Sequence, residues 1–152
     1  MLLPVLVLVA ASKPAPPKPP APKPAAQKIY APKVGSPERK ALMEALRKVT
    51  RPSLRQPVVF RVDWIRSNGS VAFFEGYPVR PDGKKIDYLK TDYADQVRAE
   101  TFDEQNGFAL WRRVKGKWTV DDWGIGDTDV PWDGMWRTKR VPRGLFPSGG
   151  RE

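Results

Sequence analysis

A run of prolines near the start of the chain limits what this part of the sequence can fold into. Eight prolines occur between Pro14 and Pro32. Proline fixes φ and has no N–H to donate, so the stretch can build neither a helix nor a sheet ladder. It should instead sample extended polyproline II, at ~3.1 Å per residue. We therefore predict an Ala/Pro/Lys-rich tether at residues 12–34 and a single folded domain at residues 35–152.

The tether carries charge of one sign. It contains no acidic residue, and its lysines recur at every fifth position, at Lys13, Lys18, Lys23, Lys28 and Lys33. Lysines in such an arrangement can make weak contact with an anionic surface such as phospholipid, lipopolysaccharide or a cell-wall polymer. Because these five are among 27 basic residues, the domain holds 22 against 17 acidic ones. This moderate excess, with no nucleic-acid-binding signature, leads us to expect no nucleic-acid partner.

An apolar run precedes the tether. Residues 2–11 read L-L-P-V-L-V-L-V-A-A, with no basic residue in front of them. A membrane span needs ~20 apolar residues, so this run is too short to be one. Its length is typical of the apolar region of a signal peptide, and small residues precede Ser12 as a signal peptidase requires. We predict a signal peptide at residues 1–11 and a periplasmic or secreted protein.

The chain contains no cysteine and no histidine. Disulfides, thiolate nucleophiles and thiolate metal sites are therefore excluded. The usual general base near neutral pH and the commonest metal ligand are absent as well. We expect a protein that is not an enzyme and that needs neither a metal nor a cofactor.

The domain should begin with an amphipathic helix. Ser36 can cap it, Pro37 suits the first helical position, and Pro52 should end it. Its apolar stripe has the spacing of one helical face and consists of Leu42, Ala45, Leu46 and Val49.

Strand patterns follow the helix. We predict strands at 57–65, 71–79 and 86–93 and a closing hairpin of 108–114 with 118–125. Residues 94–106 should form a loop or a short helical turn. The residues expected on one face of the first strand are Val58, Phe60, Val62 and Trp64. The fold class is therefore α+β, with one N-terminal helix packed on an antiparallel sheet of four or five strands and a short C-terminal helix.

Three segments of the domain resemble known proteins. The runs G-S-P-E-R-K-A-L-M-E-A-L-R, V-A-F-F-E-G-Y-P-V-R-P-D-G and A-L-W-R-R-V-K-G-K-W-T-V resemble small uncharacterised exported bacterial proteins over residues 35–146. The closing G-K-W-T-V hairpin is also similar to the end of the cone-shaped nuclear-transport-factor-like fold. This chain departs from that fold because it has one helix before the sheet and no histidines for a pocket. The resemblance implies export and the fold class, and it implies no activity.

Residues 121–136 combine five carboxylates with three tryptophans. A calcium loop is one interpretation, but the alternation of oxygen ligands is incomplete and no distal Glu follows. A glycosidase carboxylate pair and a glycan- or peptide-binding face are two others. The candidate binding residues of this stretch are Asp127, Asp129, Trp132, Asp133 and Trp136.

A structural interpretation of the same stretch is favoured. Asp127, Thr128 or Asp129 can cap a short helix whose first turn holds Pro131. Trp132 and Trp136 would then press that helix onto the sheet.

Arg112 and Arg113 are further candidates at the tip of the closing hairpin. Neighbouring strand residues point to opposite faces. The inward one should pair with Asp121 or Asp122, and the outward one can bind an anion; the strand register decides between them.

The function that fits these features is a non-catalytic, tethered envelope domain that binds a protein partner or cell-wall glycan, as an accessory subunit or an inhibitor. The alternative is a small-molecule pocket or a carboxylate-dependent hydrolase, with the sheet curled around four aromatic residues. These are Trp64, Phe73, Trp111 and Trp123.

Overall fold

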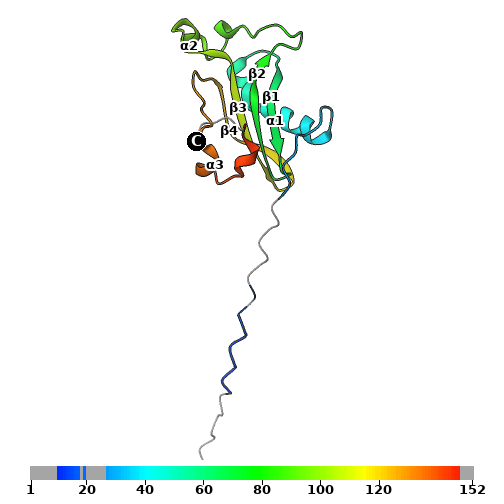
Figure 1. Ribbon diagram of the computed structural model, residues 1–152. Coiled ribbons are helices and arrows are strands. Elements are labelled where there is room, and N and C mark those ends of the chain that lie inside the picture. Colours follow the sequence, from blue (N-terminus) through cyan, green and yellow to red (C-terminus); the bar gives the residue numbers. More distant parts are fainter. Residues whose placement is uncertain (1–9, 18, 20–26, 148–152) are drawn as a thin grey trace, which may run out of the picture.

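The centre of the domain is an antiparallel sheet of four strands in the order β1-β2-β3-β4 (Figure 1). The computed structural model describes residues 10–17, 19 and 27–147, so most of the expected signal peptide and part of the tether lie outside it. The strands are β1 (Val59–Ser67), β2 (Val71–Val79), β3 (Asp103–Val114) and β4 (Lys117–Gly126). The helices and 3-10 turns are α1 (Pro37–Leu54), η1 (Tyr88–Lys90), α2 (Ala94–Arg98), α3 (Met135–Thr138) and η2 (Arg143–Leu145). The predicted α+β class is confirmed. None of the helices in the described ranges has the length and apolar character needed to cross a bilayer.

Helix α1 begins as its sequence predicts. The Ser36 side chain accepts a hydrogen bond from the Arg39 N–H at 3.2 Å, and Pro37 occupies the first turn. The prediction that Pro52 ends the helix is wrong. The helix continues to Leu54, which is completely buried. This burial stabilises the last turn although Pro52 has no N–H for a helix hydrogen bond. It ends at Arg55, which takes the left-handed conformation at φ 54°.

Both faces of the sheet are covered. On one side α1 packs its Leu42 and Leu46 onto Phe74 and Trp111. On the other side the C-terminal segment, residues 127–147, covers Phe73 and further residues of β3. Figure 1 shows α1 and this segment on opposite sides of the sheet. The domain therefore has three layers, and strand alternation in β2 and β3 sends successive apolar side chains into two separate cores.

One predicted strand face is broken by a β-bulge. The β1–β2 register shifts between Val62 and Trp64. Phe60 and Val62 pack on the α1 side as expected, whereas Trp64 packs on the side of the C-terminal segment. The prediction that Trp64 shares their face is therefore wrong, because one extra residue in a strand reverses every side chain that follows.

The strand predicted at residues 86–93 is absent. In its place are irregular backbone and the turn η1. Ile86 and Tyr88 fit the burial pattern of a strand, but they pack with Leu54 and Val58 in a small core at the end of α1. Residues 94–98 do form a short helix, α2, and the closing hairpin is confirmed, with β3 beginning earlier than predicted.

The cap predicted for the C-terminal helix is also wrong. Helix α3 begins at Met135 after Gly134, and no side chain caps it. Gly134 takes φ 70°, which glycine adopts without strain, so the turn before the helix is made by backbone conformation. Trp132 lies before the helix and is buried in the core, with 8% of its surface exposed.

Tyr88 provides a test of the end core. Its side chain is buried, and its hydroxyl has no hydrogen-bond partner among the described residues. Burial, with a smaller contribution from Glu104, raises the pKa of Tyr88 above its ordinary value of 10.0. The neutral form is therefore favoured in the folded state, and stability should fall as pH rises through ~10, where the unfolded tyrosine ionises.

We expect Tyr88→Phe to leave the free energy of unfolding near neutral pH unchanged or raise it by up to ~1 kcal/mol, since a buried, unsatisfied hydroxyl is removed. Above pH ~10 its advantage over the parent protein should grow by as much as ~1.4 kcal/mol per pH unit. Urea unfolding of both proteins at the two pH values measures this. A loss of stability at neutral pH would show that the hydroxyl does have a partner.

Candidate functional site

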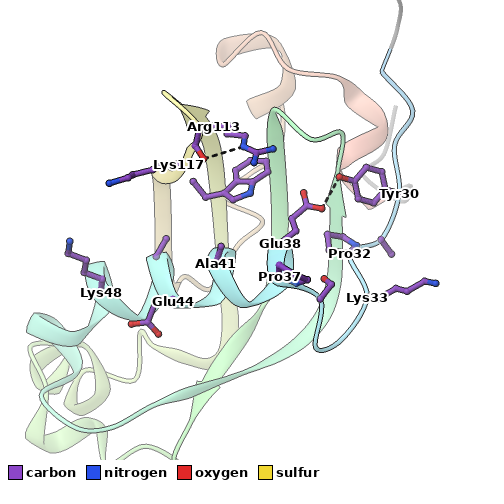
Figure 2. A pocket seen from close by; sticks show the side chains of 15 residues that line it. Tyr30, Pro32, Lys33, Pro37, Glu38, Ala41, Glu44, Lys48, Arg113 and Lys117 are labelled. Carbon is purple, nitrogen blue, oxygen red and sulfur yellow. Dashed lines mark hydrogen bonds between the residues drawn. The ribbon is translucent and has the colours of Figure 1, made fainter.

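An open groove of about 1000 Å³ lies between α1 and the tip of the β3–β4 hairpin (Figure 2). Three segments that are separate in sequence form its walls: residues 30–33 at the end of the tether, residues 37–48 of α1, and residues 113 and 116–118 of the hairpin. The groove lies on the α1 side of the sheet, at the end of the domain where the tether joins it.

The hairpin wall depends on a two-residue turn. Lys115 and Gly116 both have positive φ, of 50° and 77°. Such a turn matches the twist of the two strands that it joins. The hairpin therefore extends with little distortion and carries Arg113 and Trp118 into the groove. The Arg113 guanidinium lies 5.7 Å from the centre of the Trp118 ring, and its Nε donates to the Gly116 carbonyl at 3.5 Å.

Small side chains on α1 keep the groove open. Ala41 and Ala45 face the hairpin one helical turn apart. Glu44 and Lys48 continue the same surface of the helix, as Figure 2 shows. Larger residues at the two alanines would fill the space in front of Trp118.

The end of the tether closes the third side. Tyr30 forms an antiparallel bridge with Ser67, with N–H to carbonyl distances of 2.9 and 2.8 Å. The Tyr30 hydroxyl donates to Glu38 at 2.8 Å, and the Ser67 hydroxyl donates to the other oxygen of Glu38 at 2.6 Å. One carboxylate on α1 therefore joins the tether, the helix and the end of β1, and the ordered contacts of the domain begin before Gly35.

The charges around the groove are mostly positive. Among the described residues, no carboxylate lies within ion-pair distance of the four cations that line it, namely Lys33, Lys48, Arg113 and Lys117. The two lining carboxylates already have partners. Glu38 holds the tether, and Glu44 pairs with Arg47 at 2.9 Å.

Two pKa shifts accompany these contacts. Hydrogen bonding to Arg47 lowers the pKa of Glu44, so this carboxyl stays ionised. Burial raises the pKa of Tyr30, so its hydroxyl stays protonated and can donate to Glu38. The groove thus offers an apolar floor and unpaired positive charge at its rim.

The two arginines of the hairpin have different surroundings. Arg112 donates to Asp121 at 3.2 Å and to the carbonyl of Lys139 at 2.6 Å, so it fastens the C-terminal segment to the sheet. Arg113 is exposed and lies in the groove. The register that the sequence left open therefore gives Arg112 the structural pairing with Asp121.

The carboxylates and tryptophans of residues 121–136 do not form one cluster. Trp132 packs against Phe73 and Phe146 in the core. The backbone carbonyls of Asp127 and Asp129 accept hydrogen bonds from the Asn106 side chain, and both residues are exposed. Asp133 is also exposed, and Trp136 is half-buried. In the described part of the chain, no three acidic side chains come together as a metal site would require.

Several groove residues were not candidates in the sequence. These are Tyr30, Ala41, Lys48 and Trp118. Tyr30 is in the predicted tether, and Trp118 reads as an ordinary strand residue. A weak signal is the pair of alanines at i and i+4 beside large apolar residues on the same helix.

Comparison of the chain with protein-family models, with curated proteins and with solved structures found no match. The resemblances to small exported bacterial proteins and to the nuclear-transport-factor-like fold stay predictions.

The Glu38 junction can be tested directly. We expect Glu38→Gln to lower the hydrogen-exchange protection of the Tyr30 and Ser67 amides by about tenfold, because hydrogen bonds to a charged acceptor contribute ~1.5–3 kcal/mol and the amide group weakens both. Glu44→Gln is the matched control on the same helix and should leave both amides unchanged. Full protection in Glu38→Gln would mean that the backbone bridge holds without the carboxylate.

Proposed function

We propose that this protein is an exported, non-catalytic binding module of the bacterial envelope, and that its groove binds an acidic segment of a protein partner. The groove between α1 and the closing hairpin is the observation that carries the proposal. Export rests on the apolar run at residues 2–11 and on the proline-rich tether that follows it.

The chemistry of the groove favours a polypeptide. An open groove can take an extended segment, and Trp118 with the two alanines offers it an apolar floor. Within the described ranges, the rim cations have no carboxylate at ion-pair distance to neutralise them. Acidic side chains on either side of an apolar anchor would pair with them and increase the rate of association.

Catalysis finds no support in the groove. Glu38 and Glu44 hold other residues of the domain, and the sequence has no histidine or cysteine to act as base or nucleophile. The alternative of a pocket among four aromatic residues is also unsupported, since Trp64 and Phe73 lie on one side of the sheet while Trp111 and Trp123 lie on the other.

The groove is tested by selecting short random peptides on the full chain and measuring their affinity by calorimetry. We expect the selected peptides to combine Asp or Glu with an apolar residue. The double variant Lys48→Glu with Lys117→Glu should weaken their binding by at least about tenfold, because the two new carboxylates then repel the acidic side chains of the peptide.

Lys40→Glu with Arg51→Glu is the control, since it makes the same charge change on α1 outside the groove. It should change the affinity by less than about threefold at physiological salt, where distant charges are screened. Equal losses in both double variants, or competition by uncharged cell-wall glycan fragments, would contradict a groove for acidic peptides.

Export has its own test. In a bacterial host the protein should be recovered from the periplasm or medium with Ser12 as its first residue. Deletion of residues 2–11 should leave it in the cytosol. Recovery of the intact chain from the cytosol would contradict the envelope location without affecting the peptide measurement.

A further inference from the structure

On the side of the sheet away from the groove, arginines and tryptophans form a row. The Arg66 guanidinium lies 4.0 Å from the centre of the Trp64 ring. The guanidinium groups of Arg137 and Arg143 lie 4.5 and 5.4 Å from the centre of the Trp136 ring. These five residues are called the Arg/Trp row below.

The two stacks belong to one surface. The Trp64 indole N–H donates to the carbonyl of Leu145 at 2.7 Å, and Leu145 is in the same 3-10 turn as Arg143. Trp64 and Trp136 both pack against the core beneath the C-terminal segment. The row therefore runs from the end of β1 across η2 to α3.

Among the described residues, most of the positive charge of this surface has no acidic partner. Residues 134–147 contain four basic residues and no acid. Lys139 is held by Asp121 and Asp122. In the part of the chain that the structure covers, Arg66, Arg137 and Arg143 have no carboxylate partner.

The row also adjoins the tether. A Cβ at Gly144 would lie 2.7 Å from Ile29 Cδ1, so Ile29 reaches the backbone of η2 through the space that glycine leaves. Ile29 packs against the core on this side, and the next residue, Tyr30, lines the groove on the other. Figure 1 shows the C-terminal segment close to the end of the domain from which the tether extends. Lys28 directly precedes Ile29, so its positive charge adds to that of the row.

We propose that the Arg/Trp row is a docking surface for an anionic phospholipid membrane. Arg66 Nη1 donates to the Ile65 carbonyl at 2.7 Å, whereas the guanidinium groups of Arg137 and Arg143 have no hydrogen-bond partner among the described residues. A guanidinium stacked on an indole with its N–H edge free matches the oxygens of a phosphate group in two-point contact. Tryptophan is enriched at the level of lipid headgroups, where its ring is partly apolar and its N–H is polar. Arginines near an anionic leaflet add an attraction that the tether lysines extend. A domain bound in this way holds the groove on its opposite side, facing away from the membrane.

The test is flotation of the full chain with phosphatidylcholine vesicles that do or do not contain phosphatidylglycerol. We expect binding only to the anionic vesicles, with a blue shift of tryptophan fluorescence. Replacing three arginines by glutamine, in Arg66→Gln, Arg137→Gln and Arg143→Gln together, should lower the partition coefficient by about 100-fold, since each basic residue near the surface contributes about fivefold.

The control variant removes the same charge elsewhere, through Lys40→Gln, Arg51→Gln and Lys84→Gln. It keeps the tether and the row and should lose less than about fivefold at physiological salt. Single Arg137→Gln and Arg143→Gln variants, whose side chains are exposed, should each lose about fivefold and so test the row even if the triple variant does not fold.

Three results would overturn the proposal. One is equal loss in the two triple variants, which would assign binding to net charge and the tether. Another is binding to neutral vesicles as strong as to anionic ones. The third is binding of soluble polyphosphate, measured by calorimetry, combined with no binding to vesicles, which would mean that the row recognises free phosphate. The peptide affinity of the groove is expected to stay unchanged in every variant of the row, so failure here is distinguishable from failure of the groove.

Discussion

The two-sided packing of β2 and β3 is the constraint on which the rest of the molecule depends. Phe73 and Phe74 are adjacent in β2 and are both buried, as are Leu110 and Trp111 in β3. Adjacent strand residues face opposite ways, so each side of the sheet needs its own cover. Helix α1 supplies one and the C-terminal segment supplies the other. Since apolar packing covers both faces of the sheet, a partner can bind only outside it. The groove lies at the hairpin tip, and the Arg/Trp row runs from the end of β1 across the C-terminal segment.

The junction with the tether brings both proposed surfaces to one end of the domain. Ile29 packs on the C-terminal side, and Tyr30 packs on the α1 side, as successive residues of an extended chain do. The Glu38 carboxylate holds this crossing in place through two hydroxyl donors. The groove and the Arg/Trp row are thus fixed relative to each other by the sheet between them. A protein that docks through the row would present its groove to partners in solution.

The sequence predicts what is decided locally. The Ser36 cap, the apolar stripe of α1 and the closing hairpin follow from propensity and periodicity over a few residues, and all are present. The bulge beside Trp64 depends on pairing with β2, which lies outside the local sequence. Residues 86–93 have the pattern of a strand, but Ile86 and Tyr88 instead pack in a core that includes the end of α1. The groove was not predictable because its three walls come from separate segments. The acidic and aromatic stretch at residues 121–136 is unusual in composition, yet burial explains Trp132 and pairing explains Asp121.

We propose that two surfaces with different partners lie on opposite sides of one sheet. Hydrogen exchange of the full chain, with and without phosphatidylglycerol vesicles, tests it most directly, because each backbone amide reports its own surroundings. We expect added protection at residues 64–66 and 135–145 and unchanged exchange in α1 and at residues 113–118. Added protection in α1 and at the hairpin tip, with none over the C-terminal segment, would contradict it.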